Sequence, residues 1–75
     1  MLYLYSMKKV TIETDYIKLG QLLKYLGLVE TGGTASIYLS YGDVEVDGMT
    51  ELRRGRKILP GSVVKIDGEE YIICK

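Results

Sequence analysis

The sequence predicts an α+β domain in which a helix–turn–helix packs against a small, mostly antiparallel sheet. Leucines recur at helical spacing after residue 18, and a second helical segment ends at Gly42. Beyond Gly42 the apolar period falls from about 3.6 to about 2, with Asp-Gly turns between short alternating segments. Because the chain has 75 residues, we expect residues 1–75 to form one domain with a small core.

The first strand is expected over residues 9–13, where Val10 and Ile12 alternate with polar neighbours. The apolar stretch at residues 1–5 is too short for a membrane span or a signal core. We interpret residues 1–8 as an N-terminal extension that either precedes a true start at Met7 or adds a short edge strand.

The first helix is predicted from a leucine stripe and ends at Gly27, a favourable C-terminal cap. Gly20 inside this helix costs up to ~1 kcal/mol relative to alanine. Close approach of another backbone would account for a glycine there. The stripe consists of Leu19, Leu22, Leu23 and Leu26.

The second helix is predicted to begin at Thr31, a good N-cap, and to continue through Gly32 and Gly33. Its apolar face consists of Ala35, Tyr38 and Leu39. For Tyr25 and Tyr41, half-buried packing is favoured over stacking on unpaired bases.

Short strands make up the rest of the chain. Val44 and Val46 form one strand, and Asp47-Gly48 turns it back. Ile58 and Leu59 are expected to dock on the core. Pro60-Gly61 forms a turn, and Asp67-Gly68 joins the last two strands, at residues 63–66 and 71–74.

A basic loop, residues 53–57, concentrates positive charge in a chain whose net charge is zero. Guanidinium groups match phosphate oxygens in a two-pronged geometry, and glycine allows the backbone to approach an anion. The simplest interpretation is a solvated loop that only aids solubility. The loop could otherwise bind phosphate groups, or it could bind an acidic protein partner. The loop consists of Arg53, Arg54, Gly55, Arg56 and Lys57.

Catalytic chemistry is disfavoured by composition. The chain has no histidine and a single cysteine, Cys74, which excludes the usual zinc sites and the Ser-His and Cys-His nucleophile pairs. We therefore expect no enzyme activity, metal, cofactor or small-molecule substrate. One cysteine cannot form an internal disulfide, which favours a cytoplasmic protein without membrane association.

Residues 17–66 resemble the S-four RNA-binding domain, named for the fourth protein of the small ribosomal subunit. The resemblance rests on the helix–Gly27-Leu28–helix order, the Gly42-x-Val44-x-Val46 strand and the basic loop. The Thr31-Gly32-Gly33 turn together with that loop is similar to the short stand-alone branch, the YaaA-like proteins of bacteria.

The resemblance implies a curved sheet and an RNA-binding face that includes the helix pair and the adjacent loop. We expect this face to bind structured RNA, either ribosomal or transfer RNA, with the ribosome as a candidate partner and the protein as a monomer. The backbone amides of the glycines at the start of the second helix would add a phosphate-binding site. The predicted RNA-binding residues are Thr31, Gly32, Gly33, Lys18 and Lys24, together with the basic loop.

The chain departs from the family pattern at three places. Gly32 and Gly33 stand where many members carry arginines. Ser36 replaces a lysine that is frequent in the stand-alone branch, and Lys18 replaces a helix-capping threonine. These changes reduce the charge of the second helix and leave more of the binding to the basic loop.

Overall fold

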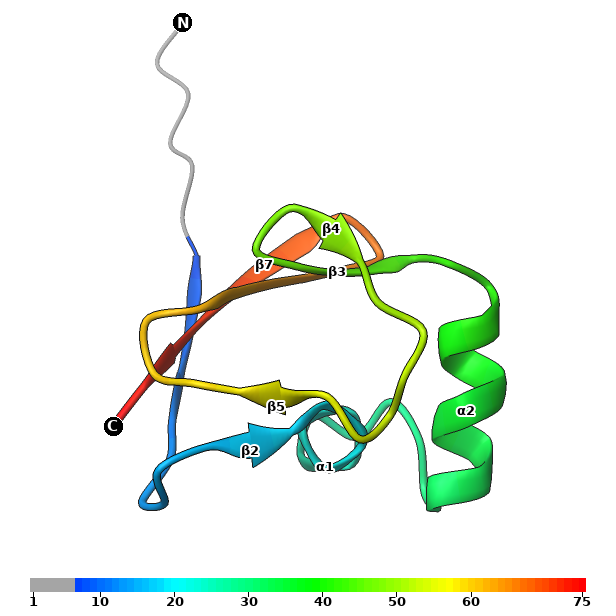
Figure 1. Ribbon diagram of the computed structural model, residues 1–75, viewed down its shortest axis with the longest axis horizontal. Coiled ribbons are helices and arrows are strands. Elements are labelled where there is room, and N and C mark those ends of the chain that lie inside the picture. Colours follow the sequence, from blue (N-terminus) through cyan, green and yellow to red (C-terminus); the bar gives the residue numbers. More distant parts are fainter. Residues whose placement is uncertain (1–6) are drawn as a thin grey trace, which may run out of the picture.

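The computed structural model describes residues 7–75 and contains two sheets and two helices. In Figure 1, α1 and the small β2–β5 ribbon lie below the large sheet, and α2 lies beside it on the right. The predicted α+β class with a mostly antiparallel sheet is confirmed. Of the N-terminal extension proposed for residues 1–8, residues 1–6 lie outside the described residues, and Lys8 is the first residue of β1. In chain order the elements are β1 (Lys8–Thr11), β2 (Ile17–Lys18), α1 (Leu19–Tyr25), α2 (Gly32–Ser40), β3 (Val44–Val46), β4 (Met49–Thr50), β5 (Lys57–Ile58), β6 (Val63–Ile66) and β7 (Glu69–Cys74).

The larger sheet has the strand order β1-β7-β6-β3-β4. Its hairpins turn at Asp47-Gly48 and Asp67-Gly68, where both residues of each pair have positive φ, between 50° and 88°. Both turns therefore have the backbone that two-residue hairpins favour, as predicted. The first strand pairs in parallel with the last one, Val10 lying opposite Ile73, so the two ends of the described chain meet in one sheet.

The core lies between this sheet and the helices. Leucines from α1 and alternate residues from the strands interlock there, as expected from their periods of about 3.6 and 2. Ile58 docks on the core as predicted, whereas Leu59 is 56% exposed and does not. The buried apolar residues are Val10, Ile12, Leu19, Leu22, Leu23, Val29, Ala35, Leu39, Val44, Val46, Ile58, Val64, Ile66 and Ile73.

Two tyrosines differ from the prediction of half-buried packing. Tyr25 is 68% exposed and Tyr41 is 73% exposed. Each lies at or just after the last turn of a helix, where the chain leaves the core. Their hydroxyls and ring faces are therefore available to solvent.

The start of α1 is held by the basic loop rather than by its own side-chain cap. Lys18 occupies the N-cap position and makes no capping hydrogen bond with its side chain. Instead, the Leu19 amide donates a hydrogen bond to the carbonyl oxygen of Arg56. The Gly20 amide donates one to the carbonyl oxygen of Arg54, and both bonds are 2.8 Å long. These contacts satisfy two of the amides that every helix leaves without an intrahelical acceptor.

Gly20 has the close backbone neighbour that its place in a helix suggests. A Cβ at this position would lie 3.2 Å from the Cβ of Arg54 and 3.3 Å from its carbonyl oxygen. That carbonyl cannot retreat without breaking its hydrogen bond to the Gly20 amide.

We expect Gly20→Ala to be less stable than Gly33→Ala by about 1–3 kcal/mol, because only the first substitution overpacks the loop. Both glycines are the second residue of a helix. The control adds the same methyl group where the nearest atom outside the adjacent residues and the helix backbone, the Thr31 hydroxyl oxygen, is 4.0 Å away. Urea unfolding of both variants measures the difference. Equal stability would show that the loop does not depend on this contact.

Candidate nucleic-acid interface

The basic loop joins β4 to β5 and is anchored at both ends. At its start lies Glu51, the one charged residue that is buried among residues 7–75, with 6% of its surface exposed. At its end, β5 pairs with β2, placing Ile17 opposite Ile58. The loop is therefore fixed between a buried carboxylate and the residues that lead into α1.

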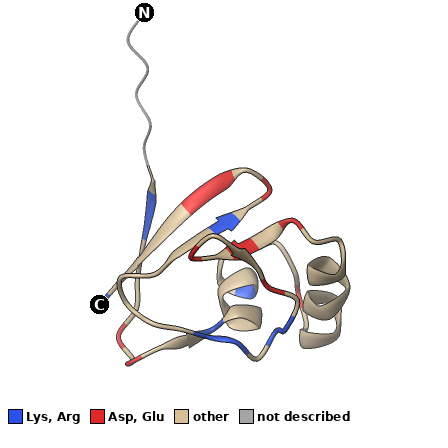
Figure 2. Ribbon diagram, turned by 45° about the horizontal axis from the view of Figure 1, so that its top comes forward, with Lys and Arg blue, Asp and Glu red and all other residues tan. Residues whose placement is uncertain are grey.

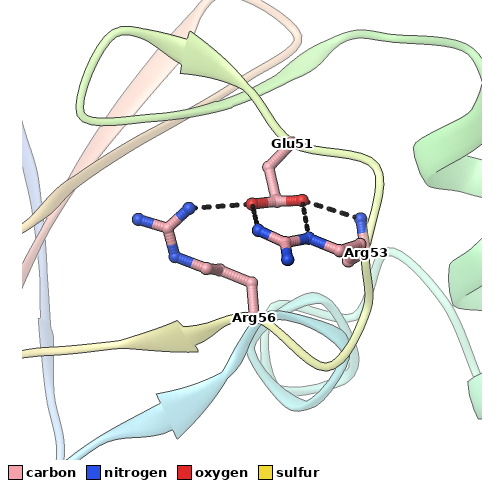
Figure 3. Close-up of polar contacts among 3 residues, drawn as sticks. All are labelled: Glu51, Arg53 and Arg56. Atoms are coloured by element: carbon pink, nitrogen blue, oxygen red, sulfur yellow. Dashed lines mark hydrogen bonds and ion pairs between the residues drawn. The ribbon is translucent and has the colours of Figure 1, made fainter.

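Glu51 binds two of the loop's arginines, as Figure 3 shows. One carboxylate oxygen accepts hydrogen bonds from the backbone amide and from Nε of Arg53, and each of these bonds is 3.0 Å long. The other carboxylate oxygen accepts a hydrogen bond of 3.1 Å from Nη2 of Arg53 and one of 2.8 Å from Nη1 of Arg56. The carboxylate is thus shared between both guanidinium groups, and it partly neutralises them.

The sequence analysis missed Glu51. Its only sequence signal is an acidic residue two positions before a cationic run. In the folded protein, hydrogen bonds from Arg53 above all lower the pKa of Glu51 to about 2. The same contacts raise the pKa of Arg53. Both groups therefore remain charged at neutral pH.

Several cations of the loop and its surroundings form no ion pair with a carboxylate of the described residues. Among residues 7–75, the ion pairs engage Lys8, Arg53, Arg56 and Lys75. Lys18, Lys24 and Arg54 are outside this set, and all three line one groove of about 280 Å³. Besides these cations, the groove is lined by Gly20, Gln21, Gly32 and Gly55.

Two lysines face each other across the small ribbon. Lys18 lies directly opposite Lys57 in the antiparallel β2–β5 pair. Like charges at this position destabilise a sheet. The Lys57 ammonium lies 4.8 Å from the centre of the Tyr16 ring, a cation–π contact that offsets part of the repulsion. The pairing places two positive charges side by side, and a bound anion would relieve their repulsion.

The start of α2 lies against the same groove. A Cβ on Gly32 would collide with the guanidinium of Arg54, so the absence of a side chain makes room for it. Thr31 caps the helix as predicted: its hydroxyl accepts from the Thr34 amide over 3.1 Å. The amides of Gly32 and Gly33 remain at the positive end of the helix dipole, next to a guanidinium.

Much of the acidic charge lies apart from the basic loop. Figure 2 shows the acidic residues mainly on the β3–β4 and β6–β7 hairpins, away from the basic loop. Glu51 is an exception, since its carboxylate binds Arg53 and Arg56 of the loop.

The structure divides the predicted binding residues into three groups. Lys18, Lys24, Gly32, Arg54 and Gly55 meet at one groove. Arg53, Arg56 and Lys57 line a neighbouring hollow, which also includes Gly55. Thr31 and Gly33 flank Gly32 in the chain, and Thr31 is engaged in capping.

Two kinds of feature are absent from the described part of the chain. No helix of residues 7–75 is long and apolar enough to cross a membrane. The same residues contain no cluster of three or more side chains suited to holding a metal ion.

Residues 10–74 match the family model of the S4 domain. The chain belongs to the S4 domain family. The match extends on both sides of residues 17–66, where the sequence resemblance was noted, because β1 and β7 are part of the fold.

Relatives of this S4 protein include small bacterial proteins. A Bacillus subtilis protein named as a probable ribosome maturation protein, RlbA, is 42% identical over 59 residues, which cover 79% of this chain and 83% of the relative. YbcJ of Escherichia coli is 40% identical over 53 residues, which cover 71% of this chain and 76% of YbcJ. The solution structure of YbcJ superposes with a TM-score of 0.66 and 29% identity, covering all of this chain and 96% of YbcJ. That structure is described as revealing an αL motif ("ALFAL") involved in RNA binding.

Glu51 gives the S4 protein a pH-dependent contribution to stability. Its pKa is lower in the folded protein than its ordinary 4.5, so the contribution is present above about pH 5 and is lost as the pH falls toward 2. We expect Glu51→Gln to cost about 1–2 kcal/mol at pH 7, because charge-assisted hydrogen bonds are lost. The difference from the native protein should shrink by pH 3.

Urea unfolding at pH 7 and pH 3 measures this change. Asp15→Asn is the control, because Asp15 is an exposed carboxylate paired with Lys75 at the surface. A stability difference for Glu51→Gln that is the same at both pH values would contradict the assigned ion pairs.

Proposed function

We propose that this protein binds structured RNA, either ribosomal or transfer RNA, without catalysing a reaction, and that the ribosome is a candidate partner. The observation that carries this proposal is the convergence of cations without carboxylate partners on the groove beside α2. Lys18, Lys24 and Arg54 line that groove, and Gly32 lets the guanidinium approach the helix start.

The groove suits a phosphodiester backbone better than a base edge. Guanidinium and ammonium groups bind phosphate oxygens, and helix-start amides add donors of the same polarity. Such contacts position an RNA without reading its sequence. Double-stranded RNA is recognised mainly by its shape and its phosphates, so selectivity would come from the spacing of phosphates across a folded RNA.

The comparisons support RNA as the partner. The family match and the fold shared with YbcJ, whose motif is described as involved in RNA binding, point to this class of ligand. The name of the Bacillus subtilis relative supports a ribosomal RNA target. An acidic protein remains the alternative partner for the same cations.

Because Glu51 partly neutralises Arg53, the two neighbouring arginines, Arg53 and Arg54, should contribute unequally to RNA binding. Arg54 has no carboxylate partner among residues 7–75, whereas Arg53 is held bidentately. We expect Arg54→Ala to weaken binding to ribosomal RNA fragments about five- to tenfold. It should also reduce the slope of log K against log salt by about 0.7–0.9, the loss of one phosphate contact. Arg53→Ala should have the smaller effect on affinity and the larger effect on stability.

Filter binding over a range of salt concentrations, with urea unfolding of each variant, separates these effects. Lys65→Ala is the matched control, because it removes an exposed cation that lies between Glu45 and Glu70 on the large sheet. An equal loss for Lys65→Ala and Arg54→Ala would contradict the assigned site. Equal affinity for heparin and for folded RNA would favour charge alone as the basis of binding.

A further inference from the structure

A second groove lies on the acidic side of the molecule, where the β6–β7 hairpin meets α2 and the loop between the helices. It has a volume of about 170 Å³. Buried Ile66 gives it an apolar base, and two phenol rings form its sides. Two carboxylates stand among its lining residues, which are Leu28, Tyr38, Ile66, Asp67, Glu69 and Tyr71.

The protein's own Lys8 shows which chemistry fits this surface. Its ammonium lies 2.7 Å and 3.2 Å from the two carboxylate oxygens of Glu69. The same ammonium lies 5.9 Å from the centre of the Tyr71 ring. A carboxylate and an aromatic face thus already hold one cation at the edge of the groove.

Further acidic groups surround the groove. Burial, followed by the charges of Asp67 and Asp43, raises the pKa of Tyr38. The Asp67 amide donates to the Asp43 carbonyl oxygen over 3.0 Å, so these two aspartates belong to adjacent segments. Three carboxylates and one internal ammonium leave this surface negative, which would repel a nucleic acid.

We propose that this groove binds a lysine or arginine side chain from a basic segment of a partner protein. The apolar base and rings accept the alkyl stem, while Asp67 and Glu69 accept the charged head. The hairpin lies away from the basic loop (Figure 2), so a protein and an RNA could be bound at the same time. This proposal does not depend on RNA binding at the loop.

A short fluorescein-labelled peptide of alternating lysine and glycine is the probe, and its glutamate analogue is the reference. Fluorescence anisotropy measures affinity, and amide shifts in a nitrogen-15 spectrum locate the site. We expect the lysine peptide alone to bind, with shifts at residues 66–71 rather than at residues 53–57.

Three variants sharpen the test. Asp67→Asn and Glu69→Gln should each weaken peptide binding about five- to tenfold, the loss of one charged contact. Asparagine also tolerates the positive φ of position 67. Lys8→Met should strengthen binding severalfold, because it removes the competing internal ammonium.

Asp15→Asn is the control, since it removes an exposed carboxylate at another site and should change peptide affinity less than about twofold. The proposal would be overturned by an equal loss for Asp15→Asn, by weaker or unchanged binding for Lys8→Met, or by shifts confined to other surfaces. Failure to bind the lysine peptide would also overturn it, and the RNA-binding assays would be unaffected by that result.

Discussion

Two backbone hydrogen bonds tie the basic loop to the first helix, and the geometry of the candidate binding surface depends on them. The amides of Leu19 and Gly20 need acceptors, and the carbonyls of Arg56 and Arg54 supply them. The loop therefore acts as the helix cap that Lys18 does not provide with its side chain. Because the cap is made by the loop's backbone, it engages none of the loop's cationic side chains, and Lys18 can carry charge.

The same anchoring divides the loop's charge into two parts. Glu51, buried at the loop's start, binds Arg53 and Arg56 and holds the chain in place. Arg54 points instead toward the start of α2, where Gly32 leaves space for its guanidinium. A cluster of four cations in five residues thus contains structural arginines as well as residues available to a ligand. The fixed geometry would lower the ordering cost of binding an RNA backbone.

Local signals in the sequence predicted much of the fold. Thr31 predicted a cap, and the Asp-Gly pairs predicted hairpins, because each depends on a few neighbouring residues. The parallel pairing of β1 with β7 and the two-residue ribbon β2–β5 arise from contacts between distant segments, and no short-range pattern marks them. The sequence named candidate binding residues, whereas their arrangement in space came only from the fold. Gly20 indicated a close backbone, yet only the fold identifies Arg54 as that neighbour and Glu51 as the carboxylate that binds Arg53 and Arg56.

The central claim is that Arg54, seated against the start of α2, contacts the RNA backbone. The affinities of Gly32→Ala and Gly33→Ala for one ribosomal RNA fragment test it most directly. Both variants keep the helix-start amides and add one methyl group, but only the first would displace the Arg54 guanidinium. The account predicts a severalfold loss of affinity for Gly32→Ala without loss of stability, and near-native binding for Gly33→Ala. Equal affinities for the two variants would contradict it.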